Sequence, residues 1–149
     1  MKIEEELRQK KFASKRQMAH LNIMFTANWL VDQVNEVVKC FGITHQQYNV
    51  LRILKGKHPS CCAAGDIREV MIDKSPDLTR LIDRLVNKAY VTRRECVENR
   101  RKLDIAITDK GLALVEKIVP TLSKQFIGQT NITDQEANEL SRLLDKMRG

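Results

Sequence analysis

A change in the spacing of apolar residues within residues 73–111 constrains the fold of this chain more than any other feature. Up to Lys88 these residues recur every three or four positions, which gives a helix one buried face: Leu78, Leu81, Ile82 and Leu85. Beyond Lys88 they alternate with polar or small residues, as in a strand: Leu103, Ile105 and Ile107. We therefore expect an amphipathic helix followed by two short paired strands, the first beginning at Val91.

The start of the predicted helix is indicated by Ser75 and Pro76. The Ser75 hydroxyl can accept a hydrogen bond from the free amides of the first turn, and Pro76 loses no useful donor at the first helical position. We expect the helix to begin there. Its uncovered side then carries charged and hydrogen-bonding side chains: Asp77, Thr79, Arg80, Asp83, Arg84 and Lys88.

The turn between the two predicted strands is rich in cations, because residues 98–102 read Glu-Asn-Arg-Arg-Lys. Asn99 is typical of turn geometry. Arg100 and Arg101 would then stand on a narrow ribbon beside the cationic helix. A helix and a ribbon that both present cations suit a polyanion with grooves.

These segments resemble the MarR (multiple antibiotic resistance regulator) family of winged-helix transcription factors. Residues 75–85 are similar to its recognition helix, residues 99–101 to the Asp-Arg-Arg of its wing, and residues 108–111 to its Thr-Glu-Lys-Gly. The chain departs from the family pattern at three positions: Ala89 for Gly, Cys96 for Asp and Asn99 for Asp.

The resemblance implies a mainly α fold, a winged helix-turn-helix with a two-stranded wing, flanked by N- and C-terminal dimerisation helices. We expect residues 44–111 to form the winged part and residues 1–42 and 112–149 the dimerisation part of a single domain, 1–149. The implied protein is a homodimeric transcriptional regulator, with repression as the expected sign, and not an enzyme. The sequence also holds no phosphate-cradling Gly loop or nucleophile elbow.

Length and charge agree with such a protein. A chain of 149 residues is one domain by the usual prior and long enough for its own core. The net charge of +7 favours an anionic partner such as nucleic acid or an acidic membrane surface. The charged N-terminus is unlike a secretory signal, and polar residues interrupt the apolar stretch 21–41, so we expect a cytoplasmic protein that does not enter a membrane.

Helices flank the central stretch on both sides. Helical spacing runs from Ala19 to Phe41, where Gly42 supplies a stop. Its apolar stripe is wide, since Trp29 and Leu30 lie beside it, and a partner subunit is the natural cover. Two further apolar helices are expected after residue 108.

Two capping boxes and a short third helix complete the expected elements. Thr44 with Gln47 and Thr133 with Glu136 have the spacing of a box that begins a helix. The third helix is expected to start near Cys62 and to turn four residues inward: Ala63, Ile67, Val70 and Met71. Only residues 72–74 would separate it from the helix at Ser75, as in a helix-turn-helix.

The predicted helix would enter the major groove of double-stranded DNA, where side chains near its N-terminus reach base edges. Those residues are Ser75, Asp77, Thr79 and Arg80, of which Arg80 can bridge two acceptors on guanine. Arg84 and Lys88 would touch phosphate, and Arg100 and Arg101 would enter the minor groove. A symmetric dimer predicts a palindromic operator with half-sites about 34 Å apart.

Other interpretations of the same residues remain open. The helix could present a solvated face on which Arg80 pairs with Asp77 or Asp83, and a charged turn is often only solvated. A winged helix can also serve protein contacts without DNA, because fold does not determine function.

Regulators of the family commonly respond to a small aromatic or phenolic effector, which is an implication of the resemblance alone. Four side chains are candidates for lining such a pocket: Met24, Phe25, Trp29 and Tyr48. At helical spacing, however, such residues are more often ordinary core.

Four cysteines offer an alternative mode of regulation, by oxidation: Cys40, Cys61, Cys62 and Cys96. Cys96 lies close in sequence to Arg93 and Arg94, and cationic neighbours lower a thiol pKa. Structural thiols are the commoner outcome in a reducing compartment. His58 with Cys61 and Cys62 gives too few ligands for zinc, so we expect no metal and no cofactor.

Overall fold

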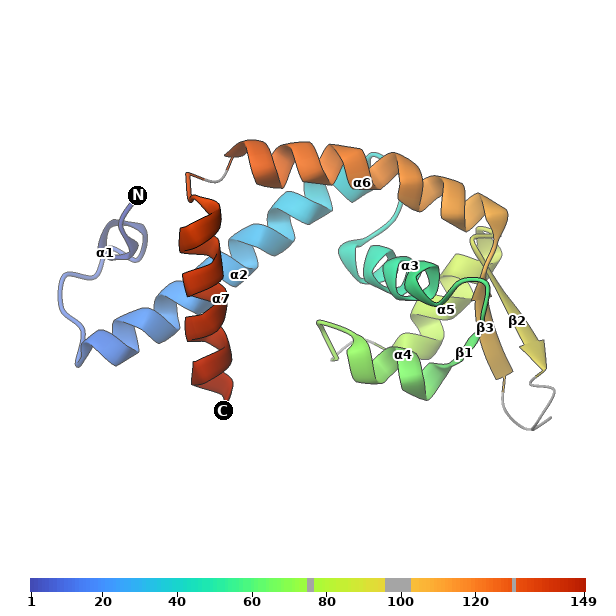
Figure 1. Ribbon diagram of the computed structural model, residues 1–149, viewed down its shortest axis with the longest axis horizontal. Helices are drawn as coiled ribbons and strands as arrows, with labels where there is room; N and C mark the ends of the chain where they lie inside the picture. The colour runs from blue at the N-terminus through green and yellow to red at the C-terminus, as the bar shows by residue number, and fades with distance from the viewer. Residues whose placement is uncertain (75–76, 96–102, 130) are drawn as a thin grey trace.

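The computed structural model describes residues 1–74, 77–95, 103–129 and 131–149. The chain is mainly α-helical with one small sheet, which confirms the predicted fold class. The elements in chain order (Figure 1) are α1 Ile3–Glu6, α2 Lys15–Lys39, α3 His45–Lys57, β1 Cys62–Ala63, α4 Ala64–Val70, α5 Leu78–Asn87, β2 Val91–Glu95, β3 Leu103–Ile107, α6 Asp109–Gln129 and α7 Asp134–Arg148.

The sheet has three antiparallel strands in the order β1-β3-β2. β2 and β3 form the expected hairpin, in which Val91 pairs with Ile107. The sequence analysis was wrong about Cys62, which begins β1 and pairs with Ile105 instead of starting a helix. Two residues are too few to show alternation, and this strand exists because β3 offers it an edge.

The core lies among α3, α4, α5, the sheet and the first half of α6. All four predicted apolar residues of α5 are buried. Ile67 in α4 and Met71 directly after it are buried as expected, but Val70 is 54% exposed. α4 ends at Val70, so the connection to α5 spans residues 71–77 and is longer than the three residues predicted.

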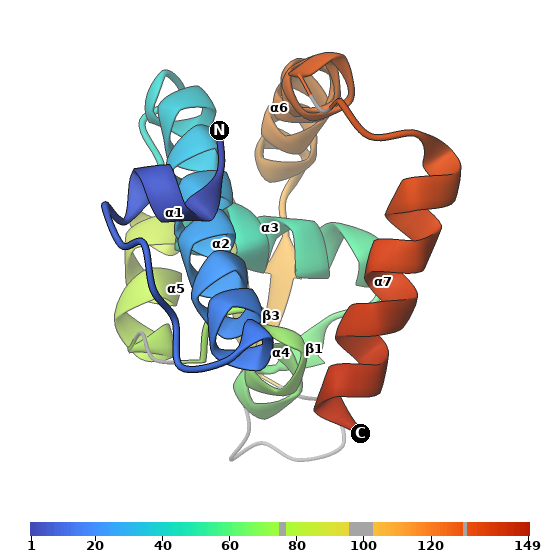
Figure 2. The same cartoon turned by 90° about the vertical axis from the view of Figure 1, so that its left-hand side faces the viewer.

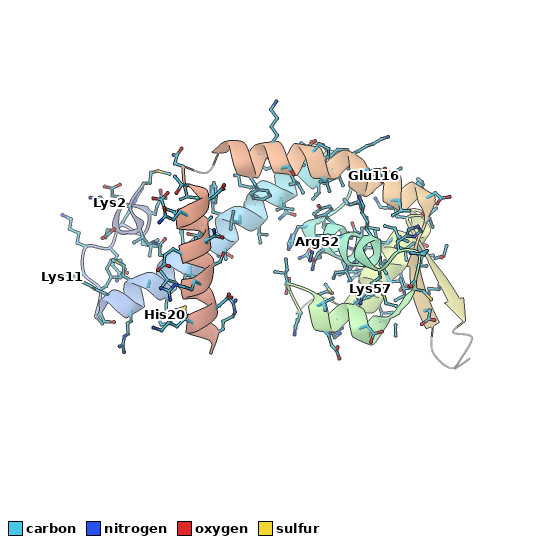
Figure 3. The ribbon with its side chains drawn as sticks, in the orientation of Figure 1. Lys2, Lys11, His20, Arg52, Lys57 and Glu116 are labelled. Atoms are coloured by element: carbon cyan, nitrogen blue, oxygen red, sulfur yellow. The ribbon has the colours of Figure 1, made fainter. Side chains whose placement is uncertain are left out.

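Two long helices connect this core to the other end of the molecule. α2 and α6 run from the core to the other end of the molecule, where α7 follows (Figure 1). Seen from that end, α7 stands apart from α1 and α2 (Figure 2). α7 has no buried residue, and three of its apolar side chains are each nearly half exposed: Leu140, Leu143 and Met147.

The helix starts show which local predictions hold. Thr44 and Gln47 form a capping box: the Gln47 amide donates to Thr44 Oγ1 at 3.3 Å, and the Thr44 amide donates to Gln47 Oε1 at 3.0 Å. Thr133 and Glu136 form another. α2 begins at Lys15, ahead of the predicted Ala19, because Ser14 caps it by accepting from the amide of Gln17 at 3.1 Å.

Candidate nucleic-acid interface

α5 is capped by Asp77, whose Oδ1 accepts from the amide of Arg80 at 3.2 Å. The predicted cap, Ser75, was therefore two residues early, since Asp77 is the cap and Leu78 is the first helical residue. A carboxylate satisfies the free amides as a hydroxyl does, and its charge also suits the positive end of the helix dipole. Ser75 and Pro76 themselves lie outside the described residues.

The outer face of α5 presents Thr79, Arg80 and Arg84 to solvent. Within the described part of the chain, the side chains of Arg80 and Arg84 form neither a hydrogen bond nor an ion pair. Asp77 accepts from the Arg80 backbone instead of its guanidinium. The described contacts thus disfavour the solvated alternative in which Arg80 is neutralised by a neighbouring carboxylate.

Asp83 has a different partner, on the neighbouring strand. Arg93 Nη2 of β2 lies 2.6 Å from Asp83 Oδ1, and both side chains are partly exposed. This ion pair joins the outer side of α5 to the strand that leads into the hairpin turn. The sequence analysis did not find it, because no local pattern brings two positions on different elements together. A helix and a hairpin are therefore held side by side.

The tip of that hairpin, residues 96–102, lies outside the described residues. The predictions for Asn99, Arg100 and Arg101 fall there, as does Cys96. Of the hairpin itself, β2 ends at Glu95 and β3 begins at Leu103, both at the end of the sheet remote from α6 (Figure 1).

Lys88 caps the C-terminal end of α5, and its ammonium is already engaged. Lys88 Nζ donates to the carbonyl of Gly42 at 2.6 Å, beyond the end of α2. Ala89, which follows, has φ +59, the left-handed backbone that the family's Gly takes freely. The amides of Ala89 and Tyr90 close the helix end on the carbonyls of Val86 and Leu85.

A cavity of about 600 Å³ lies between α2, α3 and α6. Its walls are largely apolar, and they include Leu30, Val34, Val119, Leu122 and Phe126. Met71, Ile72 and Asp73, from the connection that leads to α5, also line it. The cavity therefore touches the segment that positions the exposed face of α5.

Of the four residues predicted for an effector pocket, the structure brings only Tyr48 to this cavity. Phe25 and Trp29 lie instead in a smaller depression beside α1, and Met24 is 64% exposed. Burial raises the pKa of Tyr48, an effect that nearby Arg52 partly offsets, so the phenol stays neutral and able to donate. Sequence spacing could not reveal a cavity whose walls come from three separate helices.

Comparison with known proteins places the chain in a family. The model of the MarR family matches residues 43–103, from just before α3 to the start of β3. The transcriptional regulator SarZ of Staphylococcus saprophyticus is 30% identical over 115 residues, which covers 77% of this chain and 77% of SarZ. The chain belongs to the MarR family.

Solved MarR structures share its arrangement. A MarR transcription factor from Planctomyces limnophilus is 33% identical, with a TM-score of 0.66 over 93% of this chain and 98% of that one. A mutant of Escherichia coli MarR, in complex with operator DNA, is 28% identical, with a TM-score of 0.70 over 85% of this chain and 91% of that one. Membership of a family of transcriptional regulators agrees with the expectation that the chain is not an enzyme.

The cysteines of this MarR-family chain differ in their surroundings. Cys62 is buried, and burial, together with the charge of Asp66, raises the pKa of its thiol, which keeps it in the less reactive protonated form. Cys61 is exposed and donates to Asp104 Oδ2 at 3.3 Å. Cys40, also exposed, donates to the Glu36 carbonyl at 3.6 Å.

Two kinds of feature are missing from the described residues of this MarR-family chain. They contain no group of three or more His, Cys, Asp or Glu side chains placed to hold a metal ion. They also contain no helix with the length and apolar character to cross a membrane.

Proposed function

We propose that the chain is a sequence-specific repressor that binds double-stranded DNA as a homodimer on a palindromic operator. The observation that carries this proposal is the exposed face of α5, on which Arg80 and Arg84 have no partner within the described residues. The Arg93–Asp83 ion pair holds this face beside the hairpin whose turn contains Arg100 and Arg101.

In this proposal α5 lies in the major groove. Residues near its N-terminus, Thr79 and Arg80 with Ser75, Pro76 and Asp77 ahead of them, approach base edges. Arg80 reads guanine with two hydrogen bonds, and Arg84, one turn later, contacts phosphate. The turn at 99–101 enters the adjacent minor groove, where narrow, negative stretches attract Arg.

The dimer is supported by apolar surface that the chain leaves uncovered. α2 exposes Phe25, Trp29 and Leu30 by 36 to 42%, and α7 exposes Leu140 and Leu143 by 49% each. Exposed apolar residues repeated along two helices mark a protein interface. These helices lie within residues 1–42 and 112–149, the predicted dimerisation part. A two-fold axis between them presents two copies of α5 to the duplex.

Release by a small aromatic or phenolic effector is the second element of the proposal. The cavity has the size and apolar lining of a small-molecule site, with a few polar groups such as Tyr48 and Arg52. Because Met71, Ile72 and Asp73 form part of its wall, an occupant that displaces them also displaces the start of α5. Binding energy is thereby coupled to the orientation of the exposed face.

The test of DNA binding is selection of bound fragments from random duplexes, followed by substitution. We expect the selected sites to be palindromic and Arg80→Ala to weaken binding by about tenfold or more, with the loss concentrated at one base pair of each half-site. Arg16→Ala, which removes the same charge from the exposed N-terminal end of α2, is the control and should bind like the wild type.

The wing is tested separately by its dependence on salt. Arg101→Ala should reduce the slope of log affinity against log salt by about 0.9 for each phosphate that the arginine neutralises. Unchanged affinity for Arg80→Ala would remove the helix assignment, and an unchanged slope for Arg101→Ala would remove the wing assignment. A wild type that binds no duplex at low salt but retains protein partners would favour the protein-interaction alternative.

The effector is tested by filling the cavity. Ser123 is an exposed residue on the wall of the cavity, so Ser123→Trp can fill it without disturbing the core. An aromatic compound found to release the wild type from its operator should no longer release this variant. Thr121→Trp, exposed on the same helix but outside the lining, is the control. Equal release of both variants would place the effector elsewhere.

A further inference from the structure

The C-terminal end of α5 is held by the beginning of α6. Three successive carbonyl oxygens accept from it: Lys88 O from Lys110 Nζ at 2.9 Å, Ala89 O from Thr108 Oγ1 at 2.8 Å, and Tyr90 O from the Thr108 amide at 3.1 Å. The carbonyls at a helix end lack partners within the helix itself. The segment Thr108-Asp109-Lys110-Gly111, which resembles a family motif, therefore supplies partners for the end of α5.

Two further contacts make this junction close-fitting. The Lys110 ammonium lies 5.0 Å from the centre of the Tyr90 ring, so one side chain binds both a carbonyl and an aromatic face. Gly111 lies directly against the backbone of Tyr90, because a Cβ at that position would be 2.3 Å from the Tyr90 carbonyl oxygen. The first turn of α6 thus contacts the end of α5 through backbone as well as side chains.

The same end of α5 also reaches α2. Lys88 Nζ donates to the carbonyl of Gly42, which has φ +71 and follows the last turn of α2. A helix C-terminus carries partial negative charge, so an ammonium group is stabilised there. Lys88 therefore connects α5 to α2, and Lys110 connects α5 to α6.

We propose that Lys88 and Lys110 are positioning residues that set the angle of α5 against α2 and α6, and with it the distance between the two copies of α5 in the dimer. The inference rests on the proposed function, because α2 and α6 lead to the apolar surfaces assigned to the dimer. In this role the two lysines determine which half-site spacing the protein accepts. They act through α5 and do not touch the duplex.

This role differs measurably from the phosphate contact predicted for Lys88. A lysine that neutralises phosphate releases counterions, so its loss lowers the salt slope by about 0.9 for each contact, or about 1.8 for a symmetric dimer. A lysine that donates to Gly42 O releases none. Its loss weakens binding and loosens the spacing requirement while the salt slope stays unchanged.

The experiment uses full-length Lys88→Met and Lys110→Met, which keep the length of the side chain and remove the ammonium. Lys117→Met is the matched control, since Lys117 is exposed on α6 and has no hydrogen bond or ion pair within the described part of the chain. Affinities are measured across salt concentrations for the operator selected with the wild type. They are measured also for versions with one base pair inserted or removed at the dyad.

The preference for the selected spacing is the ratio of the affinity for that operator to the affinity for a version with altered spacing. We expect this ratio to fall about tenfold in both Met variants, the effect of losing one charge-assisted hydrogen bond. Lys88→Arg, which keeps a charged donor, should retain most of it, and Lys117→Met should retain all of it. If Lys88→Met does not fold, Lys110→Met and Lys88→Arg still test the inference.

Two results would overturn the positioning role of Lys88 and Lys110 and leave the proposed function intact. The first is a wild-type spacing preference in both Met variants. The second is a salt slope that falls by the amount expected for lost phosphate contacts. A wild type that binds no duplex would instead overturn the proposed function, and this inference with it.

Discussion

The winged part and the outer helices differ in how they cover their apolar residues. Among the described residues, the largest fully buried side chains all lie between Val38 and Ile118. α7 has an apolar stripe of similar character but no buried residue. Leu85 in α5 is 0% exposed, whereas Leu143 in α7 is 49% exposed. The same residue type thus stabilises one region within the chain, and in the other it remains exposed, on the surface that we propose as the dimer interface.

The difference between the winged part and the outer helices is tested most strongly by Leu85→Ala. Truncating a fully buried leucine removes its transfer free energy and leaves a cavity, so we expect the free energy of unfolding to fall by about 4 kcal/mol. Urea denaturation at two protein concentrations measures the change. The loss should be the same at both, because Leu85 packs only within its own chain. A loss that depends on concentration would show that the winged part also needs the partner.

The junction between the two regions is tested by Gly111→Ala. The added Cβ would meet the Tyr90 carbonyl oxygen, which belongs to rigid backbone, so we expect destabilisation by about 3 kcal/mol, as for overpacking in a close-fitting core. Gly56→Ala is the control, since a Cβ there meets nothing within 4 Å. It should stabilise α3 by about 0.5 to 1 kcal/mol. Thermal denaturation should show a lower midpoint for Gly111→Ala and a higher one for Gly56→Ala. Equal changes in midpoint would show that the backbone at the junction moves to accommodate the added methyl group.

Leu143→Ala tests whether α7 belongs to the proposed subunit interface. Covering the exposed half of this side chain in each subunit is worth about 1 kcal/mol, so the dimer should lose about 2 kcal/mol, or about 30-fold in its dissociation constant. Analytical ultracentrifugation measures this constant, and the helix content of the chain should stay unchanged. If dimerisation is unaffected, α7 is not part of the subunit interface.

The smallest expected effect is at Ala89. Its left-handed backbone is unfavourable for Ala by about 1 to 2 kcal/mol, while Gly has more freedom to lose on folding, so Ala89→Gly should stabilise the chain by about 0.5 to 1 kcal/mol. Ala113→Gly, an exposed position within α6, should destabilise it by a similar amount. Denaturation midpoints compare the two, and a destabilised Ala89→Gly would mean that the Ala methyl group contributes packing here.

The sequence analysis succeeded where one element contains its own signal. The buried face of α5, the hairpin whose first strand begins at Val91 and the box at Thr44 depend on residues that are close in sequence. It failed at β1, because a two-residue strand needs β3 beside it. It also placed the start of α5 at Ser75, where a hydroxyl and Pro76 competed with a nearby Asp77 that is equally able to cap.

In the candidate site, too, the sequence predicted what depends on one helix and missed what depends on several. Thr79, Arg80 and Arg84 could be assigned to the exposed face of α5 from spacing alone, and the structure places all three in solvent. Their DNA contacts remain a prediction. The cavity could not be predicted, and Tyr48 is the only one of its four candidates that reaches the wall. Helical spacing shows which side chains share one face of a helix, but it does not show which distant helix, if any, covers that face.

By itself the sequence determined the helices with a strong apolar period, the hairpin, two capping boxes and the family, because short-range backbone geometry translates directly into residue spacing. Only the tertiary structure decided that Lys88 reaches Gly42, that Arg93 binds Asp83, and that three helices enclose a cavity beside residues 71–73. Those contacts join positions far apart in the chain. They form because packing the common core brings the ends of separate elements to the same place.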